Sequence, residues 1–371
     1  MTDGDDAPAS APPPRPLPSG WRIWMAGARP RTLPAAIVPV LVGTACAAGM
    51  PQFVGDAGWY LYTPNTGAIY FPALTGALKG LSVWRFVAAA VVALAIQIGT
   101  NFANDYSDGK RGTDDPGQRV GPVRLVGWGL APPSHVKAAA FISFGVAGLA
   151  GLALAAAVGW WLILVGLVCF AAGWFYTGGR HPYGYYGFGE LFVFVFFGLV
   201  ATVGSAFVQT GTFAFGDFHI QQIADTGTET AAQAWAIAVQ RYPVMTVLAA
   251  VAVGCFATAL LVVNNLRDIP SDTVSGKKTL AVRIGERRTR FLYTVLMFLP
   301  FVLVPLIAGY GQRPLGAAAL IAILLAQKPI LHVLRGDRGP ALIPVLAATG
   351  RVQLVYGLLL AVGLFISTPT P

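Results

Sequence analysis

The sequence predicts an all-α integral membrane protein, a bundle of about nine transmembrane helices with a cytoplasmic N-terminus and a C-terminus outside. Composition is the first reason. Of the 371 residues, 55% are hydrophobic and only 11% are charged. A soluble domain carries about a quarter charged residues. A chain with so few cannot cover its surface with polar groups, so the lipid bilayer must act as its solvent.

Nine apolar segments are the second reason, because each is long enough to cross a bilayer, which takes about 20 mostly apolar residues. Gly159 and its neighbours alone separate the third segment from the fourth, so these two should form a tight hairpin. We expect residues 21–371 to form a single transmembrane domain. The nine segments cover approximately residues 31–49, 84–104, 136–157, 159–176, 188–208, 243–264, 291–310, 314–334 and 351–368.

Residues 1–20 differ from the rest of the chain. They are rich in Pro, Ala and Asp, and they lack the basic start and apolar stretch of a signal peptide. This composition predicts a disordered cytoplasmic tail. The first transmembrane helix would then act as an uncleaved insertion signal.

The distribution of lysine and arginine orients the helices. Cytoplasmic loops of membrane proteins are enriched in these residues. With the N-terminus inside, twenty of the 25 basic residues fall in the tail and inner loops, four fall in outer loops, and Lys328 lies within a span. The excess predicts the orientation stated above. It also accounts for the net charge of +9 without nucleic acid, because the basic residues form no cluster on a polar domain.

The few acidic residues are concentrated at two helix ends. Six of the 16 lie in two segments, NFANDYSDGKRGTDD at 101–115 and NNLRDIPSDTVSGKK at 264–278, each beginning where an apolar helix meets the cytoplasmic side. In the first segment, Asp105 and Asp108 are three residues apart, and Asn101 precedes Asp105 by four. Residues with these spacings share one face of a helix.

The second segment repeats this pattern. Asp268 and Asp272 are four residues apart, and Asn264 precedes Asp268 by four. Each segment continues with a glycine and two basic residues, GKR at 109–111 and GKK at 276–278. The chain therefore carries two Asn–Asp–Asp stripes with cationic neighbours at equivalent helix ends.

Such carboxylate pairs point to a hard cation. Like charges on one helix face repel each other, and acids at a membrane boundary are costly to desolvate. Mg²⁺ removes both problems, since it binds one or two carboxylates and completes its shell with water and phosphate oxygens. Two facing pairs with nearby Lys and Arg predict a Mg²⁺-bridged pyrophosphate between two helices. Acids that only solvate loops are the alternative, which the repetition in so acid-poor a chain disfavours.

The two acidic segments resemble the aspartate motifs N-D-x-x-D and D-x-x-x-D of the UbiA-type intramembrane aromatic prenyltransferases. The resemblance runs from about Trp21 to the C-terminus, and it is strongest for the branch that prenylates 1,4-dihydroxy-2-naphthoate in menaquinone biosynthesis. The stretches that carry it are ARPRTLPAAIVPVLVGTA (28–45), NDYSDGKRGTD (104–114), RVGPVR (119–124), YTGGRHPYGYYGFGELFVFVFFG (176–198) and NNLRDIPSDTVSGKKTLAVRIG (264–285).

The resemblance implies a role for each matching residue. Asp105 and Asp108 in the first motif, with Asp268 and Asp272 in the second, are expected to bind Mg²⁺ and to be catalytic. The residues expected to bind the diphosphate or to orient its phosphates are Asn101, Asn104, Asp114, Arg119, Arg124, Tyr176, Arg180, Asn264, Lys277 and Lys278.

The resemblance also implies the reaction and its place. A polyprenyl group would leave polyprenyl diphosphate as an allylic cation and join 1,4-dihydroxy-2-naphthoate at the carbon bearing the carboxylate, with loss of CO₂ to give demethylmenaquinone or its quinol. The long tail would require a lateral opening into lipid. The expected location is the inner (plasma) membrane, with the chemistry at its cytoplasmic face.

Several alternatives stay open at this point. Within the superfamily the acceptor could be 4-hydroxybenzoate, homogentisate or haem. A polyprenyl-phosphate sugar transferase also uses Asp and Mg²⁺ beside a membrane. A cation-coupled transporter would place its acids on broken helices near the bilayer midplane, whereas these acids lie at helix ends.

Four other residues are less specific. Arg29 and Arg31 are expected either to face the polar cavity or to act as positive-inside anchors. Glu190 lies at the start of an apolar segment, where an acid favours the helix dipole. His181 is the histidine best placed to contact an aromatic substrate. The three cysteines lie in apolar segments and form no disulfide or metal pattern.

Overall fold

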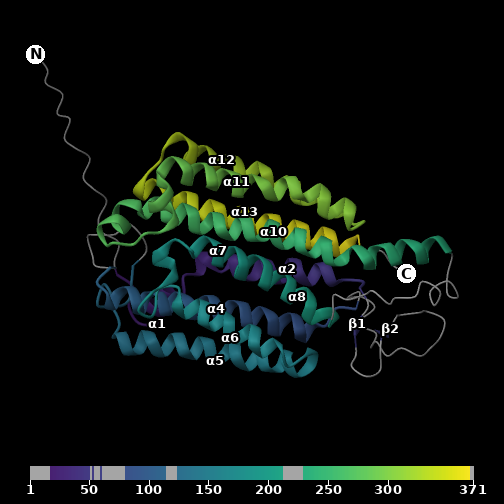
Figure 1. The fold of residues 1–371 in the computed structure, drawn as a ribbon, viewed down its shortest axis with the longest axis horizontal. Coiled ribbons are helices and arrows are strands. Elements are labelled where there is room, and N and C mark those ends of the chain that lie inside the picture. Colours follow the sequence, from purple (N-terminus) through teal and green to yellow (C-terminus); the bar gives the residue numbers. More distant parts are fainter. Residues whose placement is uncertain are drawn as a thin grey trace, which may run out of the picture.

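Helices make up nearly all of the secondary structure, as the sequence predicts (Figure 1). The computed structural model describes residues 17–50, 52–53, 59–60, 80–113, 123–211 and 229–367, leaving aside the side chains of 52–53, 59–60 and 229–239. The elements are α1 (Trp21–Ala28), η1 (Pro30–Thr32), α2 (Pro34–Ala47), β1 (Gln52–Phe53), β2 (Trp59–Tyr60), α4 (Val83–Lys110), α5 (Pro133–Val158), α6 (Leu162–Phe175), η3 (Tyr183–Tyr186), α7 (Gly189–Val193), the π-helix η4 (Phe194–Val200), α8 (Ala201–Thr210), α10 (Glu229–Val274), α11 (Leu280–Tyr310), η5 (Pro314–Ala322), α12 (Ile323–Arg335), η6 (Gly339–Leu342) and α13 (Ile343–Ile366). The short strands β1 and β2 pair antiparallel.

Seven helices in the described part of the chain are long and apolar enough to cross a membrane. An eighth span results if the segments Trp21–Thr32 and Pro34–Ala47, which meet at a bend of 51°, are counted together. The structure therefore supports an integral membrane bundle of seven to eight spans.

The fourth predicted span, 159–176, differs most from its prediction. It corresponds to α6, which has 14 residues. Such a helix is about 21 Å long, whereas the hydrocarbon core is about 30 Å thick. The flanking Trp160 and Trp161 extend its apolar run in the sequence, but both lie outside the helix.

The helices run along the long axis of the molecule in Figure 1. Helices α10 to α13 form one side of the bundle, α4 to α6 form the other, and α2, α7 and α8 lie between them. The packing agrees with this view, because α10 packs on α11, α4 packs on α5, and α2 packs on both α13 and α8. Helix α1 lies at one end of the bundle, and α13 finishes at the other.

Helix α10 is the central element of the larger core, which joins α2, α10, α11 and α13. The most apolar window of α10 is 72% buried, more than in any other candidate span of the described chain. Its Phe256 ring lies 4.9 Å from the ring of Tyr356 and 5.8 Å from that of Phe301, both edge-on. This core holds the acidic end of α10 in a defined position.

Glycines allow two close helix contacts in the middle layer. A Cβ on Gly43 of α2 would lie 2.1 Å from the Thr202 carbonyl oxygen, and a Cβ on Gly198 would lie 2.5 Å from Cα of Gly254. Small residues let membrane helices approach backbone to backbone. The α2–α8 and η4–α10 contacts are therefore closed and leave no room for a substrate.

Arg313 caps α2 from a distant part of the chain. It is fully buried, and its Nη1 and Nη2 atoms donate hydrogen bonds of 2.8 Å to the carbonyls of Ala45 and Ala48. These carbonyls lie at the C-terminal end of the helix, where the regular helical hydrogen bonds stop, and the Ala45 carbonyl also accepts a backbone bond from the Ala48 amide at 3.3 Å. Burial lowers the pKa of Arg313 to about 10, so the guanidinium stays charged near neutral pH and favours the negative end of the helix dipole.

Replacing Arg313 should therefore destabilise the fold. Arg313→Met removes the guanidinium donors from both buried carbonyls, and we expect the variant to lose roughly 3 kcal/mol of stability. The measurement is the thermal unfolding temperature of the purified protein in detergent. Arg335→Met, at an exposed position, is the control and should unfold like the unsubstituted protein. Equal unfolding temperatures for the two variants would show that the cap contributes little.

Candidate active site

A cavity of about 600 Å³ lies between the two sides of the bundle. Polar side chains line it where α4 and α10 end, and apolar side chains from α2, α4, α5, α6 and α8 line the rest. Its shape and lining suit an amphiphile with an anionic head and an apolar tail. The main polar lining residues are Arg29, Thr32, Gln97, Asn101, Asn104, Asp108, Arg124, Tyr176, Thr177, Tyr183, Tyr185, Asn264, Asn265, Asp268, Asp272, Lys277 and Thr279.

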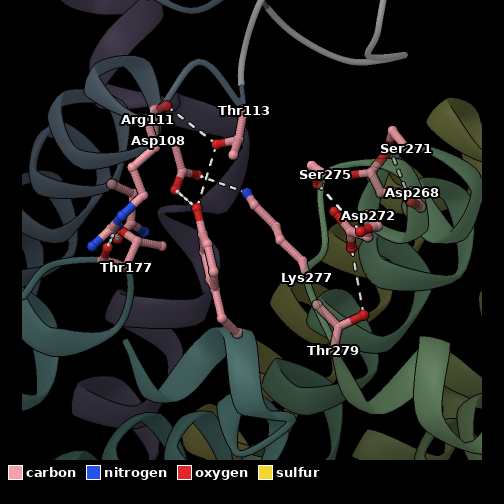
Figure 2. Close-up of polar contacts among 12 residues, drawn as sticks. Asp108, Arg111, Thr113, Thr177, Asp268, Ser271, Asp272, Ser275, Lys277 and Thr279 are labelled. Carbon is pink, nitrogen blue, oxygen red and sulfur yellow. Dashed lines mark hydrogen bonds and ion pairs between the residues drawn. The ribbon is translucent and has the colours of Figure 1, made fainter. Parts of the chain in front are cut away.

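Asp108, near the end of α4, joins three segments of the chain (Figure 2). Its Oδ2 lies 3.2 Å from Nζ of Lys277, and its Oδ1 accepts a hydrogen bond of 2.7 Å from the Tyr185 hydroxyl. The Lys277 ammonium also lies 4.6 Å from the centre of the Tyr185 ring. Burial, together with the negative charge of Asp108, raises the pKa of Tyr185. The phenol therefore stays protonated and acts as the donor in its hydrogen bond to Asp108.

Asp268, on α10, is held by its neighbour Arg267. The Arg267 Nε and Nη2 atoms bind the two carboxylate oxygens at 2.7 Å each, a bidentate pair in which both side chains are 2% exposed. The same Nη2 donates to Oδ1 of Asn264 at 2.9 Å. Because Asn264 lies one turn before Asp268, a single guanidinium holds both residues of the predicted stripe.

Asp272 lies one turn further along α10, opposite Asp108 across the cavity (Figure 2). Its Oδ2 lies 3.4 Å from the Thr279 hydroxyl. The chain leaves the helix through Gly276, whose φ of 74° suits glycine, and the Lys277 amide donates to the Asp272 carbonyl at 2.8 Å. This turn directs the Lys277 side chain back between the two motifs.

Asp105 is placed differently from its expected position, because its carboxylate faces away from the cavity. It is fully buried, and its two oxygens accept hydrogen bonds of 3.0 Å from the backbone amides of Leu125 and Val126. It does not line the cavity. Both oxygens are therefore engaged in anchoring the segment that leads into α5.

The stripe that α4 presents to the cavity consists of Asn101, Asn104 and Asp108. Their spacings of three and four residues keep them on one helix face. The Thr177 hydroxyl donates to Oδ1 of Asn104 at 2.9 Å, which fixes the amide. Asn104 therefore takes the place of Asp105 in the expected stripe, since the segment beginning at Leu125 packs on the Asp105 side.

Asn101 also stabilises the bend between α1 and α2. Its Nδ2 donates to the Ala28 carbonyl at 3.0 Å and to the Thr32 hydroxyl at 3.3 Å. Between these residues, Arg29 has a φ of 52°, a left-handed conformation that is uncommon outside glycine and concentrates at functional sites. The Arg29 side chain lines the cavity, whereas Arg31 is exposed.

The remaining predicted site residues separate into three groups. Arg124, only 5% exposed, and Tyr176 line the cavity. Lys278 and Arg180 are exposed and do not line it. Two others, Asp114 and Arg119, lie outside the described residues.

Two of the less specific residues can also be placed. His181 is exposed and does not line the cavity, and its Nδ1 lies 3.4 Å from the Tyr186 hydroxyl. Glu190 does lie in the first turn of α7, but it is 6% exposed and accepts a hydrogen bond of 2.9 Å from Asn265. Its surroundings are therefore more specific than a helix dipole requires.

Sequence reasoning missed three residues that hold the site together. Tyr185 binds Asp108, Arg267 binds Asp268, and Arg111 donates to the carbonyls of Thr177 and Gly179. Arg267 could have been found, because it directly precedes a motif acid and lies three residues after Asn264. Tyr185 and Arg111 could not, since their partners are more than 60 residues away.

The donor set suits a hard divalent cation. Asp108, Asp268 and Asp272, with the amide oxygens of Asn104 and Asn264, offer oxygen ligands from both sides of the cavity. Within the described residues, no three His, Cys, Asp or Glu side chains form a ready cage. Mg²⁺ needs none, because it commonly binds one or two carboxylates and fills its shell with water and phosphate oxygens.

The comparison with known proteins agrees with this site. The model of the UbiA prenyltransferase family matches residues 66–346, about three quarters of the chain. The chain belongs to the UbiA prenyltransferase family. UbiA relatives include the Mycobacterium tuberculosis 1,4-dihydroxy-2-naphthoate octaprenyltransferase, 42% identical over 91% of this chain and 95% of the relative. The Escherichia coli protein of the same name is 33% identical over 93% and 96%. The chain is therefore a prenyltransferase.

Solved structures show the same UbiA fold. The apo UbiA homolog from Aeropyrum pernix K1 superimposes with a TM-score of 0.57 at 12% identity, over 93% of this chain and 99% of the other. A UbiA homolog from Archaeoglobus fulgidus, solved with GPP and Mg²⁺, gives a TM-score of 0.50 at 12% identity over the same shares. At these identities the likeness establishes the fold.

The geometry around Asp105 predicts a structural effect. Asp105→Asn turns one acceptor oxygen into an NH₂ group facing a backbone amide, which should cost about 1–3 kcal/mol. We expect a lower unfolding temperature and faster proteolysis within residues 123–131. Asp337→Asn makes the same change at a half-exposed aspartate and serves as the control. If both variants unfold at the same temperature, Asp105 does not anchor this segment.

Proposed function

We propose that the protein transfers a polyprenyl group from polyprenyl diphosphate to 1,4-dihydroxy-2-naphthoate in a Mg²⁺-dependent reaction with loss of CO₂, giving demethylmenaquinol, which a separate two-electron oxidation converts to demethylmenaquinone. One observation carries this most strongly. A single cavity joins the acidic ends of α4 and α10 to an apolar channel through the bundle. Relatives covering nearly the whole chain support the choice of acceptor.

The diphosphate would bind at the polar end. Asp108, Asp268 and Asp272 would hold Mg²⁺, with Asn104 and Asn264 as further oxygen donors. When bound, Mg²⁺ would neutralise the charge that develops on the departing diphosphate. We place Asp105 in support of this site, since both its oxygens are used by the backbone of the next segment.

Basic side chains supply the remaining neutralising charge. Lys277, Arg124 and Arg29 line the same end of the cavity. Lys277 forms the ion pair with Asp108, and its ammonium would bind a phosphate oxygen of the diphosphate. The C–O bond of the allylic diphosphate would then break with both electrons going to the diphosphate. The ring carbon would attack the allylic carbon, and the ring would lose CO₂ instead of a proton.

The walls beyond the polar end would protect this cation. Tyr183 and Phe192 line the cavity and stack with ring centres 3.9 Å apart. Aromatic faces stabilise cations, and an apolar wall excludes water that would otherwise trap the carbocation. The prenyl tail would extend along the apolar channel and leave through a lateral opening into lipid.

The membrane arrangement completes the proposal. We propose nine crossings, with α6 as the short ninth one, an inside N-terminus, a C-terminus outside, and the acidic end at the cytoplasmic face of the inner (plasma) membrane. The excess of basic residues in the predicted inner loops supports this orientation. We further propose that residues 21–371 form one transmembrane domain after a disordered tail of residues 1–20.

An acceptor assay tests the function. Membranes containing the protein are given one labelled polyprenyl diphosphate with 1,4-dihydroxy-2-naphthoate, 4-hydroxybenzoate or homogentisate, and label is expected only in the naphthoate product. Asp108→Asn, Asp268→Asn and Asp272→Asn should each lower turnover about 10²–10³-fold and raise the Mg²⁺ concentration for half-maximal rate. Asp337→Asn is the control. Label in hydroxybenzoate alone, or full activity in all three variants, would contradict the proposal.

The apolar channel predicts an effect on tail length. Gly204 of α8 lines the cavity and has nothing within 4 Å of a Cβ placed on it. Gly204→Leu should narrow the channel and lower kcat/KM for octaprenyl diphosphate roughly 10-fold, with little change for geranyl diphosphate. Gly145→Leu is matched, since Gly145 is equally open but lies outside the cavity lining. Equal losses for both substrates would show that the tail does not lie along Gly204.

A further inference from the structure

Glu190 and Asn265 form a buried polar pair that the diphosphate chemistry does not use. Glu190 lies in the first turn of α7, Asn265 lies on α10, and each is 6% exposed. The Asn265 Nδ2 donates to Oε1 of Glu190 at 2.9 Å. The Glu190 Oε2 is buried and makes no hydrogen bond to any of the described residues. A carboxylate in such a place is costly, which points to a function.

The pair determines the direction of the Asn265 amide. The NH₂ group of Asn265 faces Glu190, so the carbonyl oxygen points away from it. An ionised carboxylate favours this orientation, because it accepts hydrogen bonds and cannot donate them. Asn265 lines the cavity, whereas Glu190 does not. No hydrogen bond from the described residues reaches the Asn265 Oδ1, which leaves this acceptor available to a molecule in the cavity.

Asn265 lies deeper in the membrane than the carboxylates. At 1.5 Å per residue, it precedes Asp268 by about 4.5 Å and Asp272 by about 10 Å along α10. One turn deeper, the lining residue Leu261 is apolar. Along α10, the adjacent residues Asn264 and Asn265 therefore mark the boundary between the polar and apolar lining of the cavity. The prenyl carbon bonded to the diphosphate would lie at this boundary, and the ring that attacks it must lie beside it.

Tyr176 reaches the same boundary from the end of α6. Gly189, the residue before Glu190, packs so closely that a Cβ on it would lie 3.4 Å from the Tyr176 hydroxyl oxygen and 3.3 Å from Cδ2 of Leu261. Tyr176 and Asn265 both line the cavity. The boundary thus combines an amide acceptor with a phenol, a setting that suits a hydroxylated aromatic ring.

We propose that the Asn265 carbonyl accepts a hydrogen bond from a phenolic hydroxyl of the aromatic acceptor, and that Glu190 is the positioning residue that aims this carbonyl into the cavity. This role rests on the proposed function and names the acceptor subsite within it. The hydrogen bond orients the ring beside the allylic carbon. It also draws the hydroxyl proton away from the ring, which makes the ring a better nucleophile.

Steady-state kinetics on the purified full-length protein test these roles, with each substrate varied in turn. Asn265→Ala and Glu190→Ala should each raise KM for 1,4-dihydroxy-2-naphthoate about 10-fold, because each variant loses one hydrogen bond to this substrate. The KM for the prenyl diphosphate should stay within about twofold of that of the unsubstituted protein. Glu190→Gln should remain near the unsubstituted protein, because its amide oxygen still accepts from Asn265. An equal rise in both KM values, or a Glu190→Gln variant as impaired as Glu190→Ala, would overturn the proposal.

Two controls separate the proposed role from damage to the fold. Thr246→Val removes a buried hydroxyl on α10 that donates a hydrogen bond to the Tyr242 carbonyl. This variant should leave both KM values unchanged. The double variant Glu190→Leu with Asn265→Leu removes both partners and leaves no buried polar group unpaired. It should fold even if Glu190→Ala does not, and show the same 10-fold rise for the acceptor. An unchanged acceptor KM in this variant would contradict the proposal.

Acceptor analogues identify the contact directly. Competitive inhibition is measured with 1-hydroxy-2-naphthoate and 4-hydroxy-2-naphthoate, each lacking one hydroxyl. One analogue should bind the unsubstituted protein about 10-fold more weakly than the other, and Asn265→Ala should remove the difference. If the difference in affinity persists in Asn265→Ala, the proposed acceptor subsite is wrong, while the proposed function still stands. If the unsubstituted protein does not prenylate the naphthoate at all, the proposed function fails instead.

Discussion

The site depends on one electrostatic constraint: two helices bring carboxylates and the negative ends of their dipoles to the same cavity. Helices α4 and α10 both end there, so their last carbonyls add negative potential to Asp108, Asp268 and Asp272. In a membrane protein this charge must be offset by nearby cations. Lys277 does so for Asp108 (Figure 2). Arg267 does so for Asp268.

The polar side chains near the site perform two kinds of task. Asp105, Asn101 and Arg111 bind backbone groups of neighbouring segments, and these bonds position the helix ends. Lys277 and Asp108 bind each other through side chains that can exchange partners when an anion and a cation arrive. A site that must bind a highly charged head group needs both kinds of contact. The bonds to backbone groups preserve the geometry, while the bonds between side chains rearrange. Side chains with a fixed backbone partner are therefore poor candidates for ligands, even within a motif.

The fold separates the charged chemistry from the apolar channel along one axis. The core formed by α2, α10, α11 and α13 is tightly packed, and Arg313 caps the C-terminal end of α2. This side of the bundle is therefore the rigid one. The cavity lies between this side and the side formed by α4 to α6, of which α6 is the shortest helix. Between the two zones, Asn265 and Tyr176 provide neutral hydrogen-bonding groups at the depth where an aromatic ring would meet the prenyl chain.

The sequence by itself determined the fold class, the positions of most spans and the helix ends that carry the acids, because apolar length and residue spacing are local properties. It also located Asp108, Asp268, Asp272 and Lys277 in the cavity. Only the tertiary structure decided that Asp105 faces Leu125 and Val126, that Lys277 points inward while Lys278 is exposed, and that Glu190 is buried against Asn265. Spacing defines which residues share a helix face, but the segments that pack on each face come from distant parts of the chain. Lys277 and Asp108, 169 residues apart, meet for that reason alone.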